Sequence, residues 1–280
     1  MRQSHLRGPP HRNSLPWLSV SDMRLKMSQV PAATRALEVL KLLASAPGPM
    51  TASGIARALS IPRSSAYHLL DAMRASGFVV HLPEDERWGL GVAAFEIGAA
   101  YSRHDPLVHL AKPLLQQLVR EAGSAPVVAY LGVLHATETL YVAKVESKRL
   151  PIVTEVGVRL PAALTASGRA MLAALPHAQV RANFSTAQAF VDRTGLGPRD
   201  WRTLRALLDE ERRRGYSEED GFISPGFASL AAAVRNHVQR PVAAIGVTFA
   251  SQSLDPGERL GLAHRVRWAA EQISTRLGAR

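Results

Sequence analysis

Cysteine is absent from the 280 residues of the chain, and this absence excludes disulfide bonds and metal sites built on thiolates. No apolar run approaches the roughly 20 residues that a membrane-spanning helix needs. The apolar segment at 15–20 is also shorter than the core of a signal peptide, about 7–15 residues. We therefore expect a cytoplasmic protein with no membrane partner. Hydrophobic residues still make up 46% of the chain, and its length suits two domains.

The signals of common enzyme classes are missing as well. There is no P-loop, and Ala166-Ser167-Gly168 lacks the leading glycine of a nucleophile elbow. The segment at 89–94, GLGVAA, loosely fits a dinucleotide-binding fingerprint, but no second parallel strand ending in an acidic residue follows about 20 residues later. His104 and His109 are five residues apart and do not share a helical face. We therefore expect no enzyme, no metal and no cofactor.

Acidic residues are the minority charge: 23 Asp and Glu stand against 34 Lys and Arg, and the net charge of +11 suits a polyanionic partner. The excess is uneven. Residues 1–30 carry five basic residues and one acidic residue, whereas residues 31–91 carry six and five. Residues 1–28 are expected to form a disordered basic tail, with Met23 and Met27 as alternative initiators. Any binding of nucleic acid must therefore depend on how side chains are arranged.

Residues 29–91 are patterned as a winged helix-turn-helix domain, and the ends of the first two helices are marked. Pro31 suits a helix start, and Pro47-Gly48-Pro49 stops that helix. Thr51 is expected to be the N-cap of a short second helix at 52–59. The apolar residues of the first helix share one face: Ala36, Leu37, Leu40, Leu43 and Ala44.

The third helix has one apolar side and one polar side. Pro62 opens it at a position where a missing N–H costs nothing, and Gly77 follows its end. The inner side consists of Ala66, Leu69, Leu70 and Met73, and the outer side of Arg63, Ser64, Ser65, Tyr67, His68 and Asp71. Residues 78–82 and 87–90 alternate as the two strands of a wing. The acidic wing tip at 84–86 would repel phosphate and is expected to point away from DNA.

A short polar helix face fits the major groove of DNA, where residues near the helix N-terminus reach base edges and hydroxyls or cations contact phosphates. The same face also suits the solvated side of an ordinary helical bundle. The hairpin directly after Gly77 favours DNA. The candidate DNA-binding residues are Thr51, Arg63, Ser64, Ser65, Tyr67 and His68.

Beyond the wing, a connecting helix is expected at 92–102 and a second helix at 105–121. The exposed part of the connector suits either a dimer interface or packing on its own domain. From residue 125 onward, strands alternate with helices. Strands are expected at 126–133, 139–145, 151–156, 228–234 and 242–250, and helices at 166–175, 176–184, 198–214 and 256–277. A sheet of about six strands flanked by helices indicates an α+β domain.

Several segments, in this order and spacing, resemble the IclR family of bacterial transcriptional regulators over residues 30–279. They are TRALEVLKLLA, IPRSSAYHLLDAMRASGFV, WGLG, PLVHLAKPLLQQLVREAG, LYVAKVES, EVGVRLPAALTASGRAMLAAL, ERRRGYSEEDG, PVAAIGVTF and STRLG. The chain departs from the family in three places. His68 stands where the family usually has Arg, Ser229 replaces a frequent cysteine, and GSAPVVAYLG replaces a more polar start of the first sensor strand. The identity of a ligand is therefore not transferable.

The resemblance implies an α+β architecture with a winged helix-turn-helix at 29–91, a linker helix at 92–107 and a GAF-like α/β sensor domain at 108–280. It also implies a homodimer, often paired again into a homotetramer. A two-fold dimer predicts a near-palindromic operator in double-stranded DNA.

By the same resemblance, the effector site maps onto Ile152, Leu160, Ala166, Ser167, Glu219, Ser229, Gly246 and Thr248. Residues 160–168 are expected to form a loop that runs into a helix N-terminus, where free N–H groups and the helix dipole attract a carboxylate. Apolar walls, hydroxyls and one carboxylate suit a small organic acid. Simpler roles are also open: Thr165 as a plain N-cap, Glu219 as a solvated loop acid and Ser229 as a strand filler.

The sequence therefore predicts a ligand-responsive, DNA-binding transcriptional regulator. The alternatives are a ligand-independent DNA-binding protein and an enzyme with an accessory DNA-binding head. The enzyme would need a nucleophile, a base or a metal in the pocket, and the residues predicted there include no such set.

Overall fold

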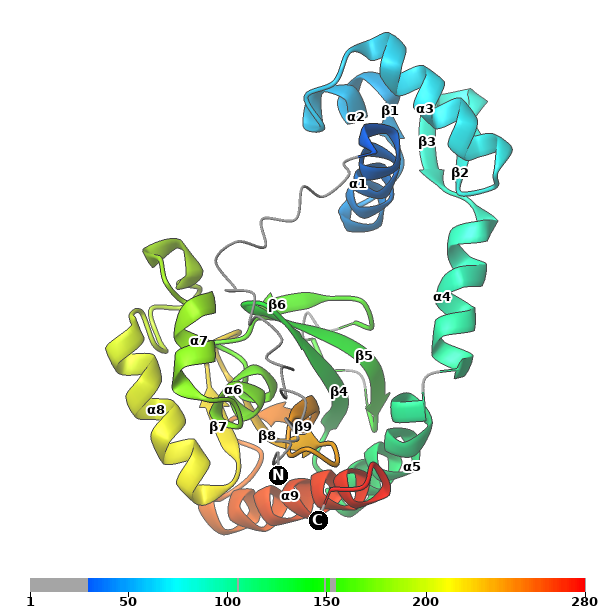
Figure 1. The fold of residues 1–280 in the computed structure, drawn as a ribbon. Helices are drawn as coiled ribbons and strands as arrows, with labels where there is room; N and C mark the ends of the chain where they lie inside the picture. Colours follow the sequence, from blue (N-terminus) through cyan, green and yellow to red (C-terminus); the bar gives the residue numbers. More distant parts are fainter. Residues whose placement is uncertain (1–29, 105, 149, 152–154, 280) are drawn as a thin grey trace, which may run out of the picture. The chain divides into compact units, whose positions relative to one another are not determined.

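The computed structural model describes residues 30–104, 106–148, 150–151 and 155–279. Its contacts divide the chain into two compact units, 1–100 and 101–280 (Figure 1). The predicted tail at 1–28 lies outside the described residues. The division falls inside the linker helix predicted at 92–107, and the finer domain boundaries remain predictions.

Between residue 30 and the end of the wing, the N-terminal unit folds into three α-helices and a small antiparallel sheet, as the sequence predicts (Figure 1). The helices are α1 (Pro31–Ser45), α2 (Ala52–Ala58) and α3 (Arg63–Ala75); the strands are β1 (Met50–Thr51), β2 (Val79–Leu82) and β3 (Arg87–Leu90), in the order β1-β3-β2. Helix α4 (Val92–His104) follows the wing. Strand β1 was not predicted because it is only two residues long, with Met50 opposite Trp88.

The core of this unit corrects the predicted inner face of α1. The side chains buried together are Val39, Leu43, Ala52, Ile55, Leu70, Met73, Val79 and Trp88. Leu37 is instead 59% exposed, and Ala44 is exposed too. Val39 and Leu43 are four residues apart and form a narrow stripe, whereas Leu37 and Ala44 belong to a second apolar stripe that has no partner in the core. Periodicity alone does not tell these two stripes apart.

The C-terminal unit is built on a six-stranded antiparallel sheet with the order β6-β5-β4-β9-β8-β7 (Figure 1). The strands are β4 (Val127–His135), β5 (Glu138–Glu146), β6 (Arg159–Pro161), β7 (Ser217–Asp220), β8 (Phe227–Arg235) and β9 (Pro241–Ala250). The helices are α5 (Pro106–Glu121), α6 (Ala166–Ala173), α7 (His177–Asn183), α8 (Trp201–Arg214) and α9 (Pro256–Arg276). The α+β prediction is confirmed.

Helices cover both faces of this sheet. The larger core lies between the sheet and helices α5 and α9, and its members include Leu115, Leu131 and Ile273, all fully buried. Helix α6 packs on the opposite face against Ala231 and Ala244. In the part of the chain that the structure describes, no helix combines the length and apolarity needed to cross a bilayer.

Two edge strands differ from the prediction. The third strand, expected at 151–156, is found at Arg159–Pro161; residues 152–154 lie outside the described residues, and Glu155 and Val156 are not in a strand. The predicted loop at 160–168 therefore begins in β6. Strand β7 was not predicted at all, because its sequence SEED lacks the apolar alternation that marks a strand.

Candidate DNA-binding surface and effector site

Helix α3 presents the polar side that the sequence predicts. Ala66, Leu70 and Met73 are buried, whereas Tyr67 is 53% exposed and Ser65 is half-buried. Three other predicted residues are exposed: Arg63, Ser64 and His68. Pro62 is the N-cap, so the polar side chains begin in the first turn. This geometry suits insertion of the helix N-terminus into a major groove.

Thr51 has a structural task in addition to its predicted place in the interface. Its Oγ1 accepts a hydrogen bond from the Gly54 amide at 3.1 Å and lies 3.2 Å from Ser53 Oγ. The hydroxyl therefore caps α2, as predicted, while the residue itself stays exposed.

A basic hollow of about 340 Å³ lies where α2 meets α3. Arg57 from the last turn of α2 and Arg63 from the first turn of α3 line it, together with Ser53, Ala56 and Ile61. Guanidinium groups and a hydroxyl are the donors that contact DNA phosphates. The sequence prediction missed Arg57 and Ser53. The available signal was the basic residue Arg57 in the last turn of α2, directly before α3.

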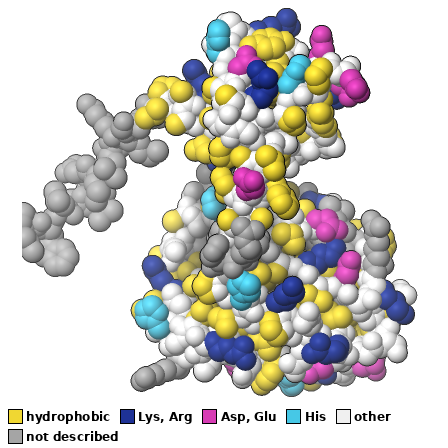
Figure 2. Space-filling model, turned by 90° about the vertical axis from the view of Figure 1, so that its right-hand side faces the viewer, with side chains coloured by type: hydrophobic (Ala, Val, Ile, Leu, Met, Phe, Trp, Pro, Cys, Tyr) yellow, Lys and Arg dark blue, Asp and Glu magenta, His cyan; other side chains and the backbone are white. Residues whose placement is uncertain are grey.

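The wing carries the opposite charge at its tip. Glu84 and Asp85 lie in a short 3₁₀ turn, and Glu86 follows in the left-handed region at φ 49°. Arg87 Nη1 donates to the Pro49 carbonyl at 3.0 Å and fastens β3 to the segment before β1. Basic and acidic side chains both occur on the face of this unit drawn in Figure 2. The surface is therefore not uniformly basic.

Three of the predicted effector residues, Glu219, Ser229 and Thr248, form a row across the sheet, and Val128 continues the row on β4. Val128 on β4 lies opposite Thr248 on β9, Thr248 opposite Ser229 on β8, and Ser229 opposite Glu219 on β7. Residues opposite one another in antiparallel strands point to the same face. The strand pairing therefore brings together four positions that are far apart in sequence.

Hydrogen bonds connect this row. Ser229 Oγ donates to Glu219 Oε1 at 2.6 Å, and the Phe222 amide donates to Glu219 Oε2 at 3.0 Å. Ser229 Oγ is 2.9 Å from Thr248 Oγ1. Because Ser229 has one proton and gives it to Glu219, Thr248 is the donor of the second bond. The lone pairs of Thr248 Oγ1 then remain for a donor from a ligand.

Glu219 is a buried strand residue, so its interpretation as a solvated loop acid is wrong. Burial raises the pKa of its carboxyl, while the Ser229 hydroxyl and the Arg169 guanidinium act in the opposite direction. Ser229 likewise does more than fill a strand, because its hydroxyl bonds to two neighbours.

The N-terminus of α6 lies over this face of the sheet. Ser167 is buried, and a methyl group on Gly246 would lie 3.1 Å from Ser167 Oγ, so a glycine in β9 allows the close approach. A methyl group on Gly168 would lie 2.3 Å from the Ala162 carbonyl oxygen. Thr165 Oγ1 accepts from the Gly168 amide at 3.0 Å and bonds to Thr139, which agrees with a plain N-cap.

Two tyrosines complete the surroundings of Ser167. Burial raises the pKa of the Tyr141 phenol, which therefore stays protonated, while the nearby Ser167 hydroxyl acts in the opposite direction. The rings of Tyr141 and Tyr130 are 4.8 Å apart, and Leu160 packs in the same cluster. The sequence prediction missed both tyrosines; the available signal was one Tyr in each of two neighbouring strands.

Two further predicted effector residues are Ala166 and Ile152. Ala166 is buried and packs against Ala231 and Ala244. Ile152 lies outside the described residues. Within the described part of the chain, no three His, Asp or Glu side chains form a group that could hold a metal ion.

A buried arginine connects this site to the rest of the unit. Arg169 is fully buried, and its Nε donates to Glu211 Oε1 at 2.9 Å. Its Nη1 donates to the carbonyls of Ala163 and Leu164 at 3.2 and 3.1 Å. The guanidinium carbon is 5.1 Å from the centre of the Phe222 ring. It thus holds the segment before Ser167 in place, a role that sequence position alone did not indicate.

Fold and site together define a winged-helix DNA-binding protein with a separate α/β ligand-binding unit. Residues 32–83 match the profile described as IclR helix-turn-helix domain, and residues 99–275 match Bacterial transcriptional regulator IclR C-terminal. The chain belongs to the IclR family. It is an IclR-type DNA-binding regulator with a C-terminal effector-binding domain.

The curated relatives carry regulatory names. The chain is 31% identical over 256 residues to the glycerol operon regulatory protein of Streptomyces coelicolor, covering 89% of this chain and 97% of the relative. It is 28% identical over 223 residues to the transcriptional repressor IclR of Escherichia coli, covering 79% and 80%.

Solved structures share the fold over nearly the whole chain. An IclR regulator from Alicyclobacillus acidocaldarius superposes with a TM-score of 0.76 at 22% identity, covering 88% of this chain and 98% of that one. An IclR homologue from Microbacterium hydrocarbonoxydans, solved with 4-hydroxybenzoate, gives a TM-score of 0.74 at 25% identity with the same coverage.

Proposed function

We propose that the protein controls transcription in the cytoplasm by binding a near-palindromic operator through α3 and by responding to a small hydroxylated organic acid. The observation that carries the proposal is the row of hydrogen-bonded side chains Glu219, Ser229 and Thr248, here called the hydroxyl row, on the sheet beneath the N-terminus of α6. The first amides of α6 offer hydrogen-bond donors to a ligand, and Thr248 Oγ1 offers an acceptor.

The carboxylate of the effector would lie at the start of α6. The first amides of a helix have no intrahelical acceptor, and the helix dipole favours a negative charge there. Ser167 adds a hydroxyl, and Tyr130, Tyr141 and Leu160 supply apolar and aromatic walls. A hydroxyl of the effector would donate to Thr248 Oγ1, whose lone pairs the Ser229 bond leaves open.

The solved homologue with 4-hydroxybenzoate supports this chemistry, because that ligand carries a carboxylate and a hydroxyl at opposite ends of an aromatic ring. We therefore infer that aromatic hydroxy acids are the first class to examine.

On the DNA side, we assign base-edge contacts to Ser65, Tyr67 and His68 and phosphate contacts to Arg63 and Ser64. Arg57 and Ser53 are added as phosphate contacts, because they line the basic hollow beside Arg63. Thr51 positions the start of α2 through its cap.

We infer a homodimer, able to pair again into a tetramer. Helix α4 exposes large apolar side chains within the N-terminal unit: Val92 at 66%, Phe95 at 75% and Ile97 at 58%. Large apolar side chains exposed in this number on one short helix favour contact with an apolar partner. A catalytic role is not proposed, since the hydroxyls of the site bond to one another and to Glu219, and the named relatives are regulators.

A thermal-shift titration of the full-length protein with 4-hydroxybenzoate and related acids tests the effector assignment. Thr248→Val removes the proposed acceptor and should weaken a binding acid about fivefold, the loss for one hydrogen bond of roughly 1 kcal/mol. Thr186→Val, at an exposed threonine outside the site, is the matched control. A Thr248→Val protein that binds the acid as well as wild type does would contradict the placement, and a panel without any hit would favour a ligand-independent regulator.

A further inference from the structure

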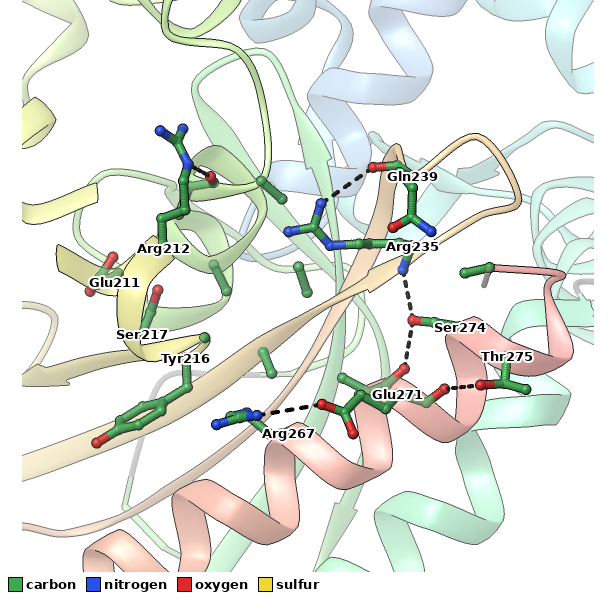
Figure 3. Close-up of a pocket in the computed structure, with 18 residues that line it drawn as sticks. Glu211, Arg212, Tyr216, Ser217, Arg235, Gln239, Arg267, Glu271, Ser274 and Thr275 are labelled. Carbon is green, nitrogen blue, oxygen red and sulfur yellow. Dashed lines mark hydrogen bonds and ion pairs between the residues drawn. The ribbon is translucent and has the colours of Figure 1, made fainter. Parts of the chain in front are cut away.

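A second cavity in the C-terminal unit lies apart from the proposed effector site. Its volume is about 340 Å³, and it opens between the ends of α6 and α8, strand β8 and helix α9 (Figure 3). Ser167, Ser229 and Thr248 do not line it. Its lining includes small apolar side chains from both sides of the sheet: Ala170, Ala173, Ala232, Ala233 and Ala270.

The cavity lies where the sheet loses a strand. Strand β7 begins at Ser217 opposite Ala231, so no strand flanks the end of β8 on that side. The Phe227 carbonyl points toward β7, since it accepts from the Gly221 amide. Backbone groups alternate direction along a strand, so the N–H and C=O of Ala233 point the same way, toward the open edge.

Two arginines at the rim have weakly engaged guanidinium groups (Figure 3). The donor–acceptor distance from Arg235 Nη1 to the Gln239 carbonyl is 3.4 Å. Arg267 Nη1 lies 3.5 Å from the Arg214 carbonyl, and its Nη2 lies 3.7 Å from the exposed Glu271 carboxylate. These distances are long for charged hydrogen bonds, so most of the N–H donors remain open to a ligand.

Arg212 at the same rim provides a contrast. Its Nε donates to the Ala173 carbonyl at 2.7 Å and its Nη2 to the Leu175 carbonyl at 3.0 Å. It therefore stabilises the end of α6 and is not counted among the ligand donors.

The lining also contains buried polar atoms that lack a partner. Among the described residues, Ser217 Oγ and Glu211 Oε2 are buried and have no hydrogen-bond partner. Burial raises the pKa of the Glu211 carboxyl, while Arg169 and the nearby Ser217 hydroxyl act in the opposite direction. A buried polar group without a partner costs about 1–3 kcal/mol, so the end of the cavity near Ser217 favours a polar occupant.

We propose that this cavity is a second ligand site for a small organic anion that carries carboxylate or phosphate groups. The donors that an anion would meet are two guanidiniums, the Ser217 hydroxyl and the Ala233 amide, while the Glu211 and Glu271 carboxylates also line the cavity. The alanines in the lining accommodate a short carbon skeleton, and the volume lies at the lower end of the range for metabolite pockets, about 300–1,000 Å³.

The second site is connected to the proposed effector site, and this part of the inference depends on the proposed function. Glu211 lines the cavity and bonds to Arg169, which holds the carbonyls of Ala163 and Leu164 just before Ser167. A ligand that shifts Glu211 would change the position of that segment. Coupling between two binding sites is reciprocal, so the effector would also change the affinity for the anion.

Isothermal titration of the full-length protein with succinate and, separately, with inorganic phosphate tests the site. We expect one of the two probes to bind, with succinate indicating a carboxylate ligand and phosphate a phosphate ester. Arg235→Gln and Arg267→Gln should each weaken that probe about tenfold, the effect of losing a charge-assisted hydrogen bond. Arg276→Gln, on the exposed side of α9 outside the cavity, is the matched control and should change affinity less than twofold.

Three outcomes would overturn the inference: neither probe binds, both cavity variants bind as wild type does, or Ser167→Leu abolishes binding of the probe. The last result would place the probe in the effector site. Circular dichroism melts verify that each variant is folded, and Ser217→Ala provides an uncharged second test of the same cavity. Failure of the effector titration with retained succinate or phosphate binding would count against the proposed function alone.

Discussion

Removing the guanidinium of Arg169 should destabilise the C-terminal unit severely. The side chains of Arg169 and Glu211 are both fully buried, with 2.9 Å between Nε and Oε1. Arg169→Met keeps much of the volume but leaves the Glu211 carboxylate without its main partner. It also removes the donor to the carbonyls of Ala163 and Leu164.

The expected loss follows from these contacts. Breaking a buried ion pair by removing one partner costs about 3–5 kcal/mol. Two features place the expected loss at the lower end: the raised pKa of Glu211 allows it to take up a proton, and Arg214 Nη2 remains 3.6 Å from its Oε1. We therefore expect a loss of roughly 3 kcal/mol, a large part of the 5–15 kcal/mol that typically stabilises a folded protein.

Urea unfolding followed by circular dichroism measures this loss. Arg214→Met is the matched control, because Arg214 is partly exposed and its pair with Glu211 is longer; it should cost less than about 1 kcal/mol. Adding Glu211→Leu to Arg169→Met removes the unpaired carboxylate and should restore part of the stability. A single Arg169→Met variant within about 1 kcal/mol of wild type, or a double variant no more stable than the single, would show that the buried pair does not stabilise the fold as expected.

Two further expectations concern charge. Neutralising the wing tip with Glu84→Gln, Asp85→Asn and Glu86→Gln should tighten DNA binding severalfold at low salt, because three carboxylates no longer repel phosphate. Fluorescence anisotropy titrations at several salt concentrations measure this affinity, and weaker binding by the triple variant would contradict the expectation. The pKa of Glu219 is raised in the folded protein from its ordinary value of 4.5. Between these two pKa values the folded state holds a proton that the unfolded state has released, so the free energy of unfolding of the wild type should fall as pH rises through this range. Glu219→Gln should remove that part of the pH dependence in urea unfolding, and identical pH profiles would be the contrary result.

The sequence predicted elements with strong periodicity and clear end signals. The three helices and hairpin of the N-terminal unit, the α6 cap at Thr165 and the four long central strands and helices of the C-terminal unit were predicted on those grounds. Caps and turns depend on neighbouring residues in the chain, so sequence alone contains their cause.

The errors have a common physical origin in tertiary context. Strand β7 is polar at every position, so only its pairing with β8 reveals it. The exposure of Leu37 depends on which of two apolar stripes meets the core. The third strand moved to Arg159–Pro161 because the pairing with β5, and not local apolarity, determines an edge strand.

The candidate site was only partly accessible for the same reason. The residues of the hydroxyl row came from a family resemblance, whereas the hydrogen bonds that join them depend on strand register. Tyr130, Tyr141 and Arg169 were missed because their roles arise from contacts between distant segments. Arg57 was missed because the hollow it lines exists only once α2 packs beside α3.

The most direct test of the account is an anisotropy titration of the full-length protein on DNA from the intergenic region beside its own gene, at moderate salt. We predict preference for that DNA over unrelated sequence, a loss of about tenfold for Tyr67→Ala, and a salt slope lower by about one for Arg63→Ala. Arg74→Ala, at the far end of α3 where Arg74 pairs with Asp71, should bind as wild type does. A folded wild-type protein without that preference, or Tyr67→Ala and Arg63→Ala variants that bind unchanged, would contradict the assignment of α3 as the helix that reads DNA.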